Sequence, residues 1–418
     1  MFSRSRVFVA VCAVVAAAST VFVTAQPGGA TPSVRGFDGK TITVAGLGIA
    51  GQLPNTPIGT QARIKQFNDT NEIKGVKIKF AEMADDKQDP AFSLSEQRRL
   101  VSQVGAFAIV PDISATNSLY LQQQHVPYFG WAFDATYCSK TTKPDTSVYG
   151  FGYDGCIENP DSKLTPDAGK LNYQYVAQKS GKKQPTIALF GNDDATEKKA
   201  IQSQVTAEKG AGFKIVLVST DLPPAGQTTD YTPIVQKLLT SDNGKAPDAL
   251  LCLTTTQCIQ VYDLVKASGY QGSYISSLYS NVLVKAMAGS AVNIQTANLN
   301  DPIPALVEIK KQLDAFQSGA SAKIDSGMLI GYFAADMFIQ ALKTVAKKGT
   351  SSITPENVQK AAMNQTWEIK GVGGPTIYPK STVIPTPYCA TQLESDGTTW
   401  KTAQAYNCSL KFYKIPGR

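Results

Sequence analysis

The stretch KTITVAG, residues 40–46, is rich in β-branched residues and predicts a strand. Apolar residues at helical spacing follow at 58–71, and VKIKFAEM, residues 76–83, alternates with the period of two typical of a second strand. Pro90 opens a second predicted helix, because proline suits the first helical turn. The pattern continues with a strand at 106–110, a helix at 114–124 and a strand at 127–131. This βαβαβαβ order predicts an α/β fold with a parallel, doubly wound sheet.

The same alternation restarts after residue 156, so we predict two α/β units in series. The second unit has predicted helices at 167–179, 195–209, 231–240 and 257–268, and predicted strands at 186–190, 213–219, 249–253 and 272–277. Residues 302–348 predict two helices split near Gly319. Thr354-Pro355-Glu356 predicts a further helix start, with a threonine cap. The tail from residue 371 predicts short strands and loops.

Composition narrows the function classes. A length of 418 residues suggests two or three domains at about 150 residues each, and 43% hydrophobic with 17% charged residues is typical of a globular protein. The net charge of +7 is spread thinly along the chain, which argues against a nucleic-acid surface. The single histidine, His125, excludes most histidine metal sites and histidine catalysis. Its position beside a predicted helix end favours a role at the helix dipole.

The first 25 residues predict a secretory signal peptide. They combine a basic start, an apolar middle and the small-residue exit VTA at 23–25. A membrane anchor is the alternative, because the apolar run approaches spanning length. We expect no later stretch to cross a membrane. The signal peptide predicts an exported protein of the periplasm, cell surface or extracellular space.

Export favours disulfides among the six cysteines beyond Cys12. Fifteen connectivities are possible, and local pairing is our prediction. The pair 252/258 is the least secure, because a strand and the next helix can hold their Cα atoms beyond bridging distance. A metal site is disfavoured, since no CxxC spacing occurs. The predicted pairs are Cys138–Cys156, Cys252–Cys258 and Cys389–Cys408.

Two motifs have competing interpretations. GLGIAG, residues 46–51, matches the dinucleotide motif GxGxxG after a strand. However, QLPNTP intervenes where a helix should begin, so we predict a turn with close backbone approach and no cofactor. DDKQDP, residues 85–90, could bind Ca²⁺. We prefer a helix start in which Asp89 caps and Pro90 follows.

Residues 192–194, NDD, follow a predicted strand, where ligand sites of α/β sheets gather. A site role and a helix cap both remain open. The sequence contains no GxSxG elbow, HExxH motif or Ser/Lys pair. A nucleophile with an activating base is therefore missing, and we predict that the protein is not an enzyme.

The order of these segments resembles the branched-chain amino-acid-binding family, the type I solute-binding proteins of ABC importers. The resemblance covers nearly the whole chain after the signal peptide. It is carried by residues 44–51, 85–90, 113–117 (ISATN), 126–133 (VPYFGWAF), 226–231 (GQTTDY), 331–336 (GYFAAD) and 354–357 (TPEN).

The resemblance implies two Rossmann-like lobes with a hinged cleft between them. Lobe one would span 36–150 plus 283–368, and lobe two 151–282 plus 369–418. A small organic solute, amino-acid-like or a hydrophobic or aromatic acid, would be trapped by lobe closure in a monomer and passed to ABC permease subunits. An exported α/β enzyme or a ligand-sensing protein of the same fold is the alternative.

The resemblance also implies ligand contacts from two loops of lobe one. Ser114, Ala115 and Thr116 match the hydroxyl loop, and Ala132 with Phe133 match the next strand end; together they would hold a carboxylate or carbonyl. Asp134 stands where the family's amino-acid binders usually place a hydroxyl.

Lobe two lacks the expected acid. Residues 276–281, SSLYSN, contain no carboxylate to pair with a ligand ammonium, and an unpaired buried ammonium is costly. Only Asp134 or Asp194 could supply the charge. Trp131, Phe133 and Tyr279 would line an aromatic pocket, with core packing as the alternative, and Thr255 is a further candidate contact. We therefore expect hydrophobic or aromatic acids to bind better than leucine.

Overall fold

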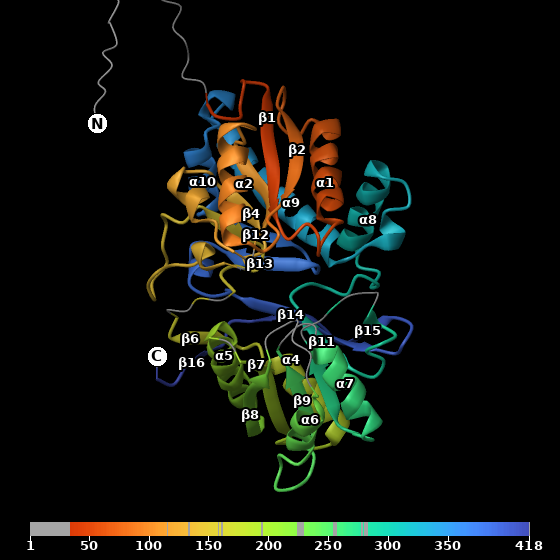
Figure 1. The fold of residues 1–418 in the computed structure, drawn as a ribbon. Helices are drawn as coiled ribbons and strands as arrows, with labels where there is room; N and C mark the ends of the chain where they lie inside the picture. Colours follow the sequence, from red (N-terminus) through yellow and green to blue (C-terminus); the bar gives the residue numbers. More distant parts are fainter. Residues whose placement is uncertain are drawn as a thin grey trace, which may run out of the picture. The chain divides into compact units, whose positions relative to one another are not determined.

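The computed structural model describes residues 34–417 except 115, 133, 158, 160–161, 194, 224–229, 254–256, 277–278 and 280–282. The predicted signal peptide lies outside these residues. Within the described part, the chain builds two separate parallel α/β layers, as the sequence predicts (Figure 1).

The first sheet has the strand order β2-β1-β3-β4-β5, and all its pairings are parallel. Its strands are β1 Thr41–Gly48, β2 Lys77–Asp85, β3 Ala108–Ile113, β4 Tyr128–Gly130 and β5 Gly150–Gly152. The helices that belong with this sheet are α1 Thr56–Thr70, α2 Pro90–Ser102, α3 Leu119–Gln123, α8 Pro304–Phe316, α9 Ser326–Ala346 and α10 Pro355–Ala362.

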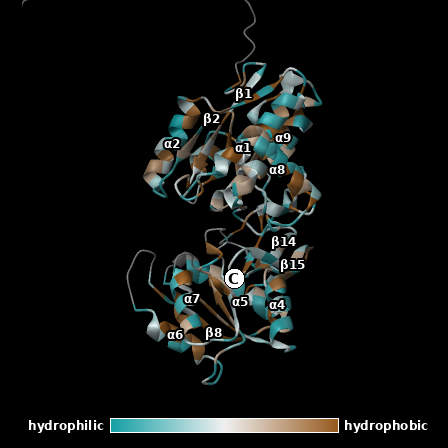
Figure 2. Ribbon diagram, turned by 90° about the vertical axis from the view of Figure 1, so that its right-hand side faces the viewer, coloured by the Kyte–Doolittle hydropathy of each residue, from teal (hydrophilic) through white to brown (hydrophobic). Residues whose placement is uncertain are grey.

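The second sheet has the order β15-β14-β11-β10-β9-β7-β8. Its strands are β7 Thr186–Asn192, β8 Lys214–Leu222, β9 Ala249–Cys252, β10 Ser273–Ser276, β11 Ala291–Ile294, β14 Tyr388–Ser395 and β15 Trp400–Ser409. Its helices are α4 Lys170–Ser180, α5 Ala195–Ala211, α6 Thr232–Leu239 and α7 Gln257–Ala267. Figure 2 shows hydrophobic colour concentrated on the strands, which form the buried cores.

Shorter pairings complete the fold. β12 Thr366–Ile369 pairs with β13 Gly373–Ile377, and β6 Leu164–Pro166 pairs with β16 Phe412–Lys414, both antiparallel. β14 and β15 also join the second sheet antiparallel, which the predicted short strands of the tail did not indicate. The sheet is therefore parallel with an antiparallel edge.

Some sequence boundaries need correction. Ala291–Ile294 pairs with Ser273–Ser276 and with β14, so this strand lies in the second sheet, whereas the boundary at 283 had placed it in lobe one. Pro111 does not end its strand, because the β3 register shifts between Ile109 and Asp112 and accommodates the missing N–H. The helix predicted from 114 begins only at Leu119.

Glycines allow α1 and α9 to pack closely. A Cβ at Gly59 would overlap the Met328 carbonyl, and one at Gly331 would overlap the Thr56 carbonyl. The Thr60 hydroxyl donates to the Gly331 carbonyl oxygen at 3.1 Å, although these residues lie 271 positions apart. The contact therefore brings α9 back to the sheet that the N-terminal strands build.

A buried ion-pair network reinforces this contact. Arg63 of α1 donates to Asp336 of α9 at 2.7 Å and to Glu72 at 2.6 Å. The Trp367 indole donates to the second Asp336 oxygen at 3.0 Å. Each charged group thus has partners, which is the condition under which buried charges are tolerated.

Among the described residues, α9 is long and apolar enough to cross a membrane, contrary to our expectation that no later stretch would be. Most of it is buried inside the protein, and Phe338 and Phe333 are fully buried in the first core. Its composition therefore reflects a core helix.

The cysteines pair as predicted: Cys138–Cys156, Cys252–Cys258 and Cys389–Cys408. The Cα atoms of Cys252 and Cys258 lie 5.8 Å apart, within the bridging range. The short loop from β9 to α7 brings them to this distance. The disulfides are consistent with an exported protein.

We predict that Gly331→Ala lowers the free energy of unfolding by about 1–3 kcal/mol, because the new methyl group forces α1 and α9 apart. Gly327→Ala is the matched control on the same helix, since its Cβ would lie 3.1 Å from the movable Thr56 hydroxyl oxygen. Urea unfolding of both variants measures the difference. Equal effects at the two positions would contradict the close-packing argument.

Candidate functional site

The loops at the carboxyl ends of β1, β3 and β4 form the candidate site, because ligands of open α/β sheets bind at this edge. Gly48 ends β1 with φ 138°, and a Cβ there would overlap the backbone of Ile113 and Ser114. The glycine motif therefore lets β1 approach the β3 loop. Since α1 begins at Thr56, it does not present a helix start to a dinucleotide.

Ser114 is the centre of a buried hydrogen-bond chain. Its hydroxyl donates to Asp86 Oδ2 at 2.6 Å and lies 3.0 Å from the Thr116 hydroxyl. The Thr116 N–H donates to Ser114 Oγ at 3.3 Å. Asp86 and Ser114 are fully buried, whereas Thr116 is half-buried. Thr116 is therefore the member of the chain that can reach a ligand.

The Asp112 carboxylate fixes the position of this loop through two hydrogen bonds. It accepts from the Ser114 N–H at 3.0 Å and from the Ser118 hydroxyl at 2.8 Å. Burial, followed by the nearby charge of Asp134, raises the pKa of Asp112 to about 7. The loop therefore rests on a carboxyl group that is partly protonated near neutral pH.

Asp134 is a cap rather than an exposed charge. It accepts from the Thr136 N–H at 2.6 Å and also from the Thr136 hydroxyl, and it starts the short 3₁₀ turn Ala135–Tyr137. Its side chain is buried, and burial raises its pKa. Both contacts are made to Oδ1, and the buried Oδ2 has no hydrogen-bond partner among the described residues.

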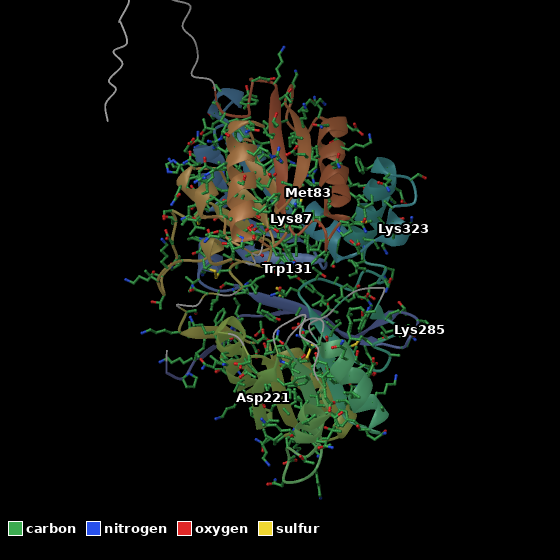
Figure 3. The ribbon with its side chains drawn as sticks, in the orientation of Figure 1. Met83, Lys87, Trp131, Asp221, Lys285 and Lys323 are labelled. Atoms are coloured by element: carbon green, nitrogen blue, oxygen red, sulfur yellow. A yellow bond between two sulfur atoms is a disulfide. The ribbon has the colours of Figure 1, made fainter. Side chains whose placement is uncertain are left out.

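Trp131 and Tyr279, the two predicted aromatic contacts within the described residues, pack against different parts of the protein. Trp131 follows β4 (labelled in Figure 3), is half-buried against the first core, and its indole interacts with the carboxyl group of Asp154. Tyr279 packs against both the first core and the core of the second sheet. Its ring lies 5.8 Å from that of Trp400. Ala132 is buried.

The acidic cluster at 85–90 is a helix start. Asp89 accepts from the Phe92 N–H at 2.7 Å, and Pro90 follows in the first turn of α2. Within the described part of the chain, no group of three His, Cys, Asp or Glu side chains could hold a metal ion. The hydrogen bond from the Phe92 N–H confirms the predicted helix cap at Asp89.

Several predicted contacts cannot be placed. Ala115, Phe133, Asp194 and Thr255 lie outside the described residues. Of the NDD segment, Asn192 ends β7 and Asp193 pairs with Lys198.

The sequence analysis did not assign Asp86, Asp112 or Asp154 to the candidate site. A carboxylate within or just after an otherwise apolar strand was the available signal, because an acid is seldom buried without a role.

The comparisons with known proteins agree with this geometry. The sequence profile of a family described as periplasmic binding proteins matches residues 45–398. No curated protein matches the chain significantly. The chain therefore belongs to the periplasmic binding protein family, whose members bind solutes and are not enzymes.

Solved structures show the same fold at low identity. A fatty acid ABC transporter substrate-binding protein from Thermomonospora curvata has 16% identity and a TM-score of 0.67 over 92% of this chain and 97% of that one. A branched-chain amino acid ABC transporter structure from Thermus thermophilus with bound valine has 15% identity and a TM-score of 0.63, over 88% and 96%. An R. palustris solute-binding protein in complex with benzoate has 9% identity and a TM-score of 0.62, over 89% and 98%. The predicted type I two-lobed fold is confirmed.

We predict that Ser114→Ala lowers the free energy of unfolding by about 1–3 kcal/mol, because it removes a donor from the buried Asp86 carboxyl group. Thr116→Val is the matched control, and we expect it to cost less than half as much, since a half-buried hydroxyl can exchange its partner for water. Chemical unfolding of both variants checks this. A Thr116→Val loss as large as that of Ser114→Ala would contradict the assignment.

Proposed function

We propose that this protein is the substrate-binding component of an ABC importer and that it traps a small hydrophobic or aromatic acid. The observation that carries the proposal is the pair of hydroxyl groups of Ser114 and Thr116, 3.0 Å apart directly after β3, at the sheet edge where ligands of α/β folds bind. Closure of the two lobes around the solute would exclude water and create the form that permease subunits recognise.

The polar part of the proposed site is the Thr116 hydroxyl. Ser114 already donates its proton to Asp86, so its oxygen is left to accept. Thr116 has its hydroxyl beside Ser114 and is half-buried, which leaves it able to turn toward a solute carboxylate or carbonyl. The backbone at Ala132 is the second proposed contact.

The absence of a carboxylate from the sequence SSLYSN, residues 276–281, supports an acid over an α-amino acid. Asp134, one of the two residues that could have supplied the charge, has its carboxylate engaged by Thr136 and buried. Both contacts from Thr136 are made to Oδ1, whereas Oδ2 is buried without a hydrogen-bond partner in the described part of the chain, so an ammonium that approached Oδ2 would have to lose its own hydration. The predicted contacts at Ala115, Phe133, Asp194 and Thr255 stay part of the proposal from sequence.

Aromatic side chains supply the proposed apolar part. Trp131 is half-buried at the end of β4, and Tyr279 is half-buried between the two cores. Burial raises the pKa of Tyr279 to well above its usual range, so its phenol stays neutral. A neutral aromatic wall favours an apolar solute body.

The proposal extends to location and organisation. We propose an exported monomer, in the periplasm or at the cell surface, whose residues 1–25 are a signal peptide. The proposed lobes are those predicted from sequence, with the strand Ala291–Ile294 transferred to lobe two. The disulfides support an oxidising location.

The test is a thermal-shift panel on the mature protein, followed by calorimetry. We expect benzoate-like and fatty acids to raise the melting temperature more than leucine or valine. Thr116→Val should weaken the best acid about 10-fold, as expected for a lost hydrogen bond to a charged group. Thr141→Val, on an exposed loop, is the control and should leave affinity unchanged.

Tight leucine binding that is unaffected by Asp134→Asn and Asp194→Asn would refute the choice of an acid over an amino acid. Turnover of any bound solute that one substitution abolishes would refute the binding-protein function itself.

A further inference from the structure

A small cavity lies where the chain passes between the two sheets. The connecting stretches, which we name the crossover segments, are the described residues of 153–163 (without 158 and 160–161), 295–303 and 378–387. The cavity has an internal volume of about 10 Å³, room for one water-sized guest. Every crossover segment contributes to its lining, which is Tyr153, Asp154, Gln295, Gly374, Pro375, Thr376, Pro385, Pro387, Tyr388, Cys389 and Tyr406.

Asp154 is the charged group of this cavity, and it is poorly satisfied. Both of its carboxyl oxygens are buried, and neither has a hydrogen-bond partner of good geometry. Weaker interactions with the Trp131 indole and the Ala132 N–H only partly offset burial, which raises the pKa of Asp154 well above its usual range. No lysine, arginine or histidine of the described residues is among the groups that act on it.

Three hydroxyl groups that line the cavity do not relieve Asp154, because they donate elsewhere. Tyr406 donates to the Gly374 carbonyl at 2.7 Å, and Thr376 donates to the Tyr153 carbonyl. Tyr388 donates to Asn293 Oδ1 at 3.3 Å. Each hydroxyl therefore keeps only oxygen lone pairs for the cavity. A carboxylate that is surrounded by oxygen acceptors and tyrosine rings is a favourable environment for a cation.

We propose that the Asp154 cavity binds one small monovalent cation. A single carboxylate with neutral oxygen ligands balances one positive charge, whereas Ca²⁺ sites generally recruit more acidic side chains. The cavity admits an ion no larger than water. Because the crossover segments enclose it, the bound ion ties the connections between the lobes together. Asp154 adjoins the proposed solute site, because it interacts with the Trp131 indole and the Ala132 N–H, but the cation proposal does not depend on which solute the protein carries.

The test compares chloride salts at equal ionic strength. Na⁺, K⁺ and NH₄⁺ should each be tried against tetramethylammonium, which is too large to enter. We expect at least one small cation to raise the melting temperature by about 2–4 °C at saturating concentration, as ion binding to the folded state requires. Asp154→Asn should lose this response.

Glu208→Gln is the matched control. Glu208 is also a buried acid with an oxygen, Oε2, that has no hydrogen-bond partner within the described residues, but it lies in α5 and does not line the cavity. Its Oε1 accepts from Asn172 at 2.6 Å and Gln204 at 2.7 Å. It should keep the full cation response. A second measurement needs no variant: ²³Na line broadening by the wild-type protein should be reversed by K⁺ or NH₄⁺ but not by tetramethylammonium.

Identical melting temperatures in all four salts, together with no competition in the ²³Na experiment, would overturn the proposal. The cavity would then contain a protonated Asp154 and a water molecule. A cation response that survives in folded Asp154→Asn would overturn it as well. Solute affinity should be measured in the same variants. If the protein binds its solute but shows no cation response, only the cation proposal fails, and the proposed transport function is unaffected.

Discussion

The close contact between α1 and α9 is the constraint on which the rest of the structure depends. Gly59 and Gly331 permit backbone-to-backbone packing that any larger residue would prevent. Arg63 and Asp336 then fix the register of the two helices. Because α9 must return to the first sheet after the second has been built, the chain is forced to cross between them repeatedly. The crossover segments, and the cavity among them, follow from this one interface.

The sequence predicted the α/β architecture well, because strand and helix periods alternate clearly and the caps at Asp89 and Thr354 are strong local signals. The disulfide pairs were also predicted correctly. What escaped prediction was non-local. The resemblance had implied that residues 369–418 belong to the second lobe, but no local pattern encodes the antiparallel pairing of β14 with β11 and of β15 with β14. The short helix α3 starts late because Ser114 and Ser118 are held by Asp86 and Asp112.

The candidate site was predictable only in outline. The hydroxyl loop could be recognised, but its orientation depends on carboxylates from other elements. Asp86 turns the Ser114 hydroxyl inward, and Thr136 engages Asp134. These interactions join residues that are distant in sequence or masked by ordinary turn patterns. They make the hydroxyl groups of Ser114 and Thr116 unequal, because Ser114 is fully buried whereas Thr116 is half-buried, and they engage one oxygen of Asp134.

The 271-residue separation between Thr60 and Gly331 also bears on the order of assembly during synthesis. The second sheet's β7 to β11 core consists of segments close in sequence and can form early. The first lobe cannot complete its core until α9 has emerged, since loop closure over such a length precedes any gain from packing. The N-terminal half is therefore left without its buried partner until most of the chain has been translated.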